Sequence, residues 1–140
     1  MVVADTSIIY KWLREEDTRH VSLILLDKFL AGEQKVIAPD ILLYELANVL
    51  SSKAELTLKD ISAAWNLFVN FKIEIFNPTP DFFPKCLKFA KEHKVTVYDA
   101  SYAILAQENN CDLFTADSKF VKAVNLPFVK HLSQYPLDTN

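Results

Sequence analysis

Short runs of consecutive apolar residues recur along the chain and predict the strands of a buried sheet. Each run is mainly apolar rather than alternating between apolar and polar, which is typical of parallel strands covered on both faces. The expected strands are Val2–Asp5, Lys35–Ala38, Ile73–Phe76, Asp112–Thr115 and Phe128–Lys130. Strands covered on both faces need helices on either side, so the pattern predicts an α/β protein.

The segments between these runs have the spacing of helices. Between residues 20 and 31 apolar side chains return every three or four positions, and Gly32 follows as a C-terminal stop. Asp40 can cap one helix, and Thr57 with Asp60 resembles a capping box that opens another. The expected helices cover residues 20–31, 41–53, 58–71, 80–93, 97–108 and 118–124.

Strands and helices therefore alternate along the chain, and we expect the order β-α-α-β-α-α-β-α-α-β-α-β. This order predicts a three-layer α/β/α sandwich around a central, mostly parallel sheet of four or five strands, joined by right-handed crossovers. We expect a single domain over residues 1–135 and a loose C-terminal tail over residues 136–140.

The composition removes several classes of protein. The chain has 140 residues, of which 51% are hydrophobic, so it can bury a core without disulfides or a structural metal. Cys86 and Cys111 form no CxxC pair, which excludes a zinc ribbon and a thioredoxin-type site. We find neither a signal peptide nor an apolar run of spanning length, and we expect a cytoplasmic protein without a membrane anchor.

The number and spacing of the glycine and histidine residues exclude further kinds of active site. Gly32 is the single glycine, whereas a dinucleotide fingerprint, a Walker A loop and a GxSxG elbow each need at least two. The three histidines are far apart and form no HExxH motif. Any hydrolytic chemistry must therefore come from carboxylates.

Four of the 18 acidic residues lie beside segments that must be buried. They are Asp5, Glu45, Asp99 and Asp117. Asp5 and Asp117 follow expected strands, Asp99 opens a helix, and Glu45 lies one turn into another. Since ligand sites in parallel α/β folds gather at the carboxyl ends of the strands, all four side chains can converge on one pocket.

A structural explanation stays open for each of these acids. Asp5, Asp99 and Asp117 each precede a plausible helical segment, so each can be an N-cap. Glu45 lies on a largely apolar helix, where Asn48 and Ser52 would extend a polar edge. Taken together, however, several carboxylates in one partly buried pocket repel one another, and a divalent cation relieves that repulsion.

The residue types indicate which ion would bind. Ligands that are all oxygen favour Mg²⁺ or Mn²⁺, and the absence of histidine or cysteine beside these motifs argues against zinc. Mg²⁺ prefers carboxylates together with substrate phosphate, so the expected reaction is phosphodiester hydrolysis. Asp99 or Asp117 would position or deprotonate the attacking water, and both one-metal and two-metal mechanisms are open.

Four segments of the chain, taken in order, resemble the PIN-domain ribonucleases, and most closely the VapC-type toxins of prokaryotic toxin–antitoxin pairs. The segments are VVADTSIIYKWL, IAPDILLYELANVL, VTVYDASYAILAQENNCDLFTAD and LPFVKHL. Asp5, Glu45, Asp99 and Asp117 match the acidic quartet of that family. Ser7 and Thr115 match hydroxyl positions that support those carboxylates.

This resemblance implies a PIN-like fold and a single-stranded RNA endonuclease that uses Mg²⁺ or Mn²⁺. It also implies a homodimer and, for the toxins, an inhibitory VapB-like antitoxin that places a basic side chain in the acidic pocket. For the homodimer, the sequence adds aromatic side chains in excess of what one small core needs. These are Trp65, Phe68, Phe82 and Phe83.

The net charge of −3 and the pI of about 5.6 argue against a nucleic-acid partner, since such proteins usually carry a basic face. A bound metal, however, reverses the local sign of an acidic pocket. Basic side chains near the motifs are candidate RNA contacts, with ordinary solvated surface as the alternative. They are Lys11, Arg14, Lys53, Lys119 and Lys122. Trp12 and Tyr98 can stack on bases, although core packing is the simpler expectation for both.

Other functions compete with a toxin. One is an RNA-processing PIN nuclease outside a toxin–antitoxin pair, and another is a PIN-like module without catalysis. A receiver domain would need paired acids after the first strand and Lys-Pro after the last, whereas Asp5 stands alone and His131 follows Lys130. A HAD-type phosphatase would need a second acid in the DTS motif.

Overall fold

A computed structural model of the protein describes residues 1–14 and 19–137. All five expected strands are present, and their bounds are β1 Val2–Ala4, β2 Val36–Pro39, β3 Glu74–Phe76, β4 Asp112–Thr115 and β5 Val129–His131. They pair in the order β3-β2-β1-β4-β5, and every pairing is parallel. The prediction of a central parallel sheet is therefore confirmed, with five strands.

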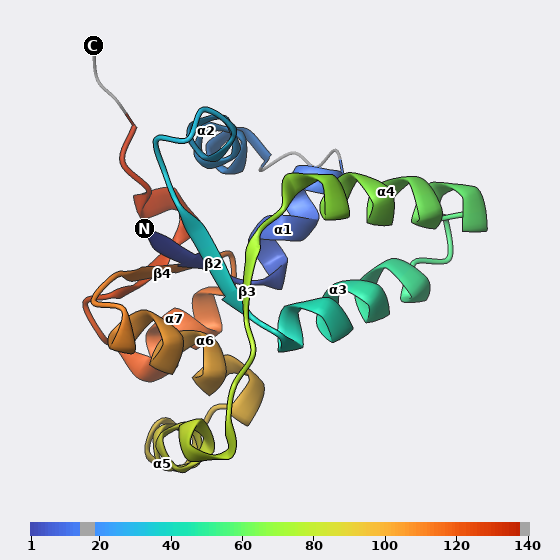
Figure 1. The fold of residues 1–140 in the computed structure, drawn as a ribbon. Helices are drawn as coiled ribbons and strands as arrows, with labels where there is room; N and C mark the ends of the chain where they lie inside the picture. The colour runs from blue at the N-terminus through green and yellow to red at the C-terminus, as the bar shows by residue number, and fades with distance from the viewer. Residues whose placement is uncertain (15–18, 138–140) are drawn as a thin grey trace.

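Helices fill every connection between the strands. Their bounds are α1 Thr6–Leu13, α2 Arg19–Leu30, α3 Ile41–Ser52, α4 Leu58–Phe71, α5 Phe83–His93, α6 Val97–Glu108 and α7 Ser118–Val124, with short 3₁₀ turns η1 at Pro80–Phe82 and η2 at Leu132–Gln134. Right-handed crossovers place α1 to α4 on one face of the sheet and α5 to α7 on the other, as Figure 1 shows. The three-layer arrangement is thus the one that the sequence predicts.

The core lies between the central strands and the helices that cover them. Val3, Ala4, Leu113 and Phe114 are almost fully buried, as expected for strands covered on both faces. Helix α6 is buried along residues 100–106 and contacts β1, β2 and β4. This helix lies flat on the sheet, and α5 packs against it from outside.

Trp12 belongs to this core and is not a base-stacking residue. Its side chain is only 2% exposed, and its ring stacks on Phe29 with 5.8 Å between the ring centroids. The indole Nε1–H donates to the backbone carbonyl of Ser22 at 2.7 Å. Through these two interactions Trp12 packs α1 against α2.

The helix ends follow the sequence signals with one exception. Gly32 has a φ of +75° just after α2, and Thr57 with Asp60 forms the expected capping box at α4. Asp40, in contrast, makes no side-chain cap at α3, so that prediction is wrong. Its backbone is already helical, and its N–H donates to the carbonyl of Phe76 at 3.0 Å, which ties the start of α3 to β3.

Three other helices end at a residue other than glycine in the left-handed region. Lys72, Lys94 and Asn125 follow α4, α5 and α7 with φ values of 53°, 55° and 48°. A left-handed conformation is unfavourable for lysine because its Cβ approaches the following carbonyl. These positions therefore hold strain that a glycine would not.

The C-terminal segment returns to the core at Tyr135, whose ring packs edge-on against Phe114 at 5.1 Å between centroids. Residues 138–140 of the expected tail lie outside the described residues. Among the helices that the structure describes, none combines the length and the apolar character needed to cross a membrane. Cys86 and Cys111 are both free thiols.

Candidate active site

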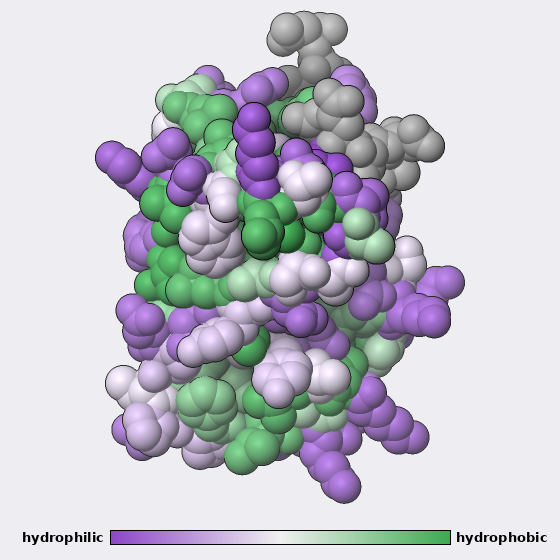
Figure 2. All heavy atoms as spheres, turned by 90° about the vertical axis from the view of Figure 1, so that its right-hand side faces the viewer, coloured by the Kyte–Doolittle hydropathy of each residue, from purple (hydrophilic) through white to green (hydrophobic). Residues whose placement is uncertain are grey.

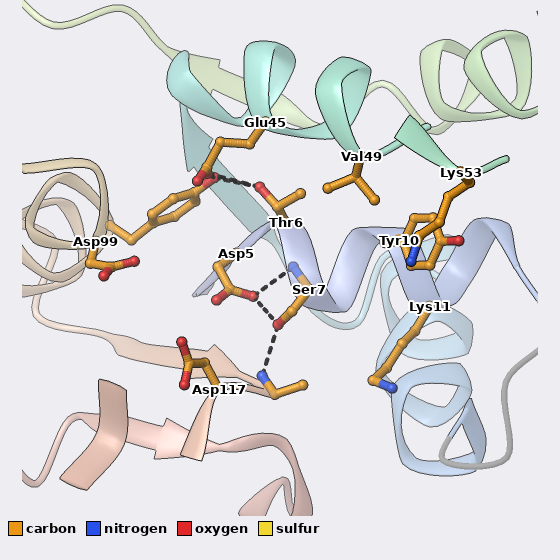
Figure 3. Close-up of a pocket in the computed structure, with 12 residues that line it drawn as sticks. Asp5, Thr6, Ser7, Tyr10, Lys11, Glu45, Val49, Lys53, Asp99 and Asp117 are labelled. Atoms are coloured by element: carbon orange, nitrogen blue, oxygen red, sulfur yellow. Dashed lines mark hydrogen bonds between the residues drawn. The ribbon is translucent and has the colours of Figure 1, made fainter. Parts of the chain in front are cut away.

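A cavity of about 390 Å³ opens where β1 and β4 end side by side. The chain continues from β1 to β2 on one side and from β4 to β5 on the other, so this is the switch point where parallel α/β folds bind ligands. Asp5, Glu45, Asp99 and Asp117 all line the cavity, and Figure 3 shows their carboxylates around one space. They come from the start of α1, from α3, from α6 and from the start of α7.

Asp5 is held by the first turn of the helix that it begins. Its Oδ1 accepts hydrogen bonds from the Ser7 backbone N–H at 3.0 Å, from Ser7 Oγ at 2.5 Å and from the Ile8 N–H at 3.4 Å. Burial nevertheless raises the pKa of Asp5 from 3.8 to about 6, the hydrogen bonds of Ser7 and Thr115 oppose the rise, and the Glu45 charge adds to it. The fold thus keeps this carboxylate where its negative charge is poorly solvated.

Two hydroxyls connect Asp5 to the loop that carries Asp117. Ser7 Oγ accepts the backbone N–H of Ala116 at 2.8 Å, and Thr115 Oγ1 accepts that of Asp117 at 3.0 Å. Asp117 Oδ1 in turn caps α7 by accepting the N–H groups of Lys119 and Phe120 at 3.0 and 3.1 Å. Ser7 and Thr115 therefore fix the two aspartates relative to each other.

Glu45 is held by side chains from two other helices. Its Oε1 accepts hydrogen bonds from Thr6 Oγ1 at 2.9 Å and from the Tyr102 hydroxyl at 2.6 Å. The two hydroxyl oxygens are themselves 2.9 Å apart, and since each has one proton, both protons can serve the carboxylate at once. Burial, with the Glu45 charge next, raises the pKa of Tyr102, so its hydroxyl stays a donor.

Asp99 is not the N-cap of α6. Thr96 takes that place, and its Oγ1 accepts the backbone N–H of Asp99 at 3.0 Å. Burial, together with the charges of Glu45 and Asp117, raises the pKa of Asp99 in spite of hydrogen bonding with Thr96. The capping alternative thus holds for Asp5 and Asp117, fails for Asp99, and never applied to Glu45.

The donor set fits a hard divalent cation in an open site. All the candidate ligands are carboxylate oxygens, and the raised pKa values of Asp5 and Asp99 are what a nearby cation would reverse. Within residues 1–14 and 19–137, no three His, Cys, Asp or Glu side chains are close enough to form a ready-made metal cage. Mg²⁺ retains several waters and needs only one or two direct carboxylates, so the wider spacing suits it.

The structure separates the candidate basic residues into three groups. Lys11 and Lys53 line the carboxylate cavity, and the Lys53 ammonium lies 5.4 Å from the ring centroid of Tyr10. Lys119 lines an adjoining cavity. Arg14 and Lys122 do not line the carboxylate cavity, and Arg14 instead acts electrostatically on Asp60.

The aromatic predictions need correction as well. Tyr98 precedes Asp99 on α6 and is 57% exposed, so its expected place in the core is wrong. Phe68 and Phe82 are buried and cannot serve as a surface for a partner, whereas Phe83 is 40% exposed.

Several lining residues went unnoticed in the sequence. Thr6 and Tyr102 hold Glu45, and Tyr10 and Val49 complete the wall. Helical spacing would have found most of them: Tyr102 is three residues after Asp99, and positions 49 and 53 follow Glu45 at intervals of one turn. Thr6 carries no such signal, because threonine beside a cap is common.

The model of the PIN domain family matches residues 2–126, and the chain belongs to that family. No curated protein matches the chain.

Solved structures with the same fold include toxins. PAE2754 from Pyrobaculum aerophilum is 22% identical with a TM-score of 0.71, and the match covers 94% of this chain and 89% of that one. VapC20 of Mycobacterium tuberculosis, a toxin that cleaves the sarcin–ricin loop, is 16% identical with a TM-score of 0.68, covering 92% and 97%. A toxin–antitoxin complex from Klebsiella pneumoniae matches at 16% identity and a TM-score of 0.70, covering 94% and 98%. At these identities the likeness is one of fold.

Proposed function

We propose that this PIN-domain protein is a Mg²⁺- or Mn²⁺-dependent endonuclease that hydrolyses single-stranded RNA, as the toxin of a toxin–antitoxin pair. One observation carries the proposal: four carboxylates from four separate segments line one cavity at the switch point of the sheet. Two of them, Asp5 and Asp99, have pKa values raised chiefly by burial. An arrangement of poorly solvated acids costs stability and therefore indicates a function.

The chain's own residues would divide the work as follows. Asp5, Glu45, Asp99 and Asp117 would hold the metal, one or two of them directly and the others through its water ligands, and the metal would supply Lewis-acid stabilisation of the phosphate and an activated water. Thr6 and Tyr102 would keep Oε1 of Glu45 in place, and the described residues make no hydrogen bond to its Oε2.

Asp99 is the better candidate for the group that takes the proton from the attacking water. Asp117 Oδ1 already accepts two backbone N–H groups at the start of α7, whereas the cap of α6 is Thr96. Lys11 and Lys53, on the wall of the cavity, would neutralise the charge of the RNA backbone.

The toxin assignment rests on the structural neighbours, among them the Klebsiella complex and VapBC2 of Rickettsia felis bound to a DNA fragment of its promoter. By analogy, the partner of this chain would be a VapB-like antitoxin. A basic residue of that antitoxin would pair with the carboxylates, because arginine binds carboxylates with two parallel hydrogen bonds.

We also propose a homodimer, on a surface that differs from the one the sequence indicates. Large apolar side chains are exposed on α3 and α4, and they are Tyr44, Leu58, Leu67 and Val69. Figure 2, which looks onto the side where α3 and α4 extend, shows hydrophobic areas separated by a paler band. Light scattering at micromolar concentration tests this proposal, and a monomer mass would refute it.

A cleavage assay with a matched control tests the nuclease. The purified chain, given a mixed-sequence single-stranded RNA and Mn²⁺, should cut it at internal positions, and EDTA should stop the reaction. Glu45→Gln is the control, because glutamine keeps an acceptor for Thr6 and Tyr102 while removing the charge. Cleavage that continues in EDTA, or that is equal in the two proteins, would refute the proposed site.

A further inference from the structure

Two more cavities adjoin the carboxylate cavity, one on each side. The first, of about 430 Å³, shares Lys11 and Ala116 with it and reaches α2 and η2. The second, of about 450 Å³, shares Asp99 and Asp117 with it and reaches α7 and the end of α5. We name them the α2 cavity and the α7 cavity. The shared residues make the three hollows one row with the carboxylates in the middle.

The α2 cavity has apolar walls and a polar rim. Val21 and Leu132 line it together with His20, His131 and Ser133. His131 Nδ1 accepts the backbone N–H of Ser133 at 3.2 Å, so in the neutral imidazole the proton is on Nε2, which is then a donor. Apolar faces with a few hydrogen-bonding groups at one edge suit a nucleobase, which is itself flat, apolar on its faces and polar at its edge.

The α7 cavity has a different chemistry. It is lined by Lys94, which ends α5, and by Lys119, in the first turn of α7. Neither lysine forms an ion pair within the part of the chain that the structure describes. Two such cations beside an acidic pocket, in a chain of net charge −3, fit a phosphate group of a nucleic-acid backbone.

We propose that the RNA strand crosses all three cavities. The phosphate to be cleaved lies over the carboxylates, the base of an adjacent nucleotide enters the α2 cavity, and a backbone phosphate on the other side binds between Lys94 and Lys119. This assignment rests on the proposed nuclease function and adds to it the path of the RNA strand across the site and the pocket that selects a base.

Binding measured without cleavage tests the α7 cavity. Affinity for a labelled single-stranded RNA is measured in EDTA at several salt concentrations, for the wild type and for Lys94→Asn with Lys119→Gln. Asparagine tolerates the left-handed backbone of position 94. Each phosphate neutralised on a single strand contributes about −0.7 to the slope of log K against log salt, so the double variant should bind more weakly with a slope reduced by at least about 0.7.

The control removes the same charge elsewhere. Lys91→Asn with Lys59→Gln changes exposed lysines near the end of α5 and in the first turn of α4, and neither residue lines any of the three cavities. This variant should retain the wild-type slope. Equal slopes in the two double variants would overturn the α7 assignment, because the effect would then come from net charge alone.

Base selection tests the α2 cavity. Oligonucleotides that differ only in the base beside the cleaved bond are compared for cleavage by the wild type, Val21→Phe and Leu30→Phe. Val21 lines the cavity, while Leu30 is 61% exposed at the far end of the same helix. The base preference should be lost in Val21→Phe and kept in Leu30→Phe. If Val21→Phe does not fold, Ser133→Ala, on the rim, replaces it.

The possible outcomes distinguish a failure of the cavity assignments from a failure of the proposed nuclease function. A wild type that cleaves no RNA refutes the proposed function, and the row with it. A wild type that cleaves without base preference, or a folded Val21→Phe that keeps the preference, overturns the α2 assignment alone. Variants that bind and select RNA normally but lose a protein partner would assign the cavities to that partner and overturn the proposal.

Discussion

Replacement of Asp5 by asparagine should make the metal-free protein more stable at neutral pH. Asparagine retains an oxygen for the N–H groups of Ser7 and Ile8, and it caps a helix about as well as aspartate. It removes a carboxyl group whose pKa the fold raises to about 6, mainly through burial. The substitution therefore keeps the hydrogen bonds from the backbone N–H groups of Ser7 and Ile8 and relieves an electrostatic cost.

The size and pH dependence of that cost follow from the pKa. A pKa of about 6 in the folded protein against 3.8 in the unfolded chain corresponds to about 3 kcal/mol. Because the folded-state pKa is the higher one, the stability that Asp5 contributes is fully present below pH 3.8 and is lost as the pH rises through 6. About 2 kcal/mol of the total loss should fall between pH 4.5 and pH 7.5.

Urea unfolding in EDTA at those two pH values measures the effect. The difference in the free energy of unfolding between Asp5→Asn and the wild type cancels the other titrating groups. It should grow from about 1 kcal/mol at pH 4.5 to about 3 kcal/mol at pH 7.5, in favour of the variant. A difference that is zero, or that does not change with pH, would refute the reasoning.

Three further results are expected. Tyr102→Phe removes one of two hydroxyl donors to Glu45 and should lower the free energy of unfolding by about 1.5–3 kcal/mol in urea, with reduced but measurable cleavage. Lys72→Gly removes the strain of a lysine in the left-handed conformation and should raise the free energy of unfolding by up to about 1 kcal/mol, whereas Lys72→Ala should give no gain. Mg²⁺ at 100 times its Kd should stabilise the wild type by about 2.7 kcal/mol and raise its Tm, and it should do much less for Asp117→Asn.

Most of the fold could be predicted from the sequence because buried parallel strands leave an unmistakable apolar run. Asp112–Thr115 was placed at its true bounds, and the other strands shifted by one residue or less at each end. No bounds were predicted for α1, Thr6–Leu13. The predicted cap at Asp40 was wrong, because a hydrogen bond from its backbone N–H to the carbonyl of Phe76 decides the geometry. Such a contact joins residues far apart in sequence, so local preference cannot foresee it.

The carboxylates of the candidate site could be predicted from the sequence, but the residues that hold Glu45 in place could not. Asp5 and Glu45 stand out because acids beside buried segments need an explanation. The Thr6 and Tyr102 hydroxyls that hold Glu45 come from two other helices, and their role appears only once α1, α3 and α6 are packed together. The prediction that Tyr98 packs in the core was wrong because an aromatic residue suggests burial, whereas this side chain is exposed at the start of α6.

Asp99→Asn provides the most direct test of the central claim, because Thr96 and not Asp99 caps α6. Cleavage of a single-stranded RNA with Mn²⁺ is measured for the wild type and the variant, alongside the melting temperature of each in EDTA. The wild type should cut the RNA, and Asp99→Asn should be slower by orders of magnitude while melting at the same temperature or higher. An Asp99→Asn protein that is folded and as active as the wild type would contradict the carboxylate site.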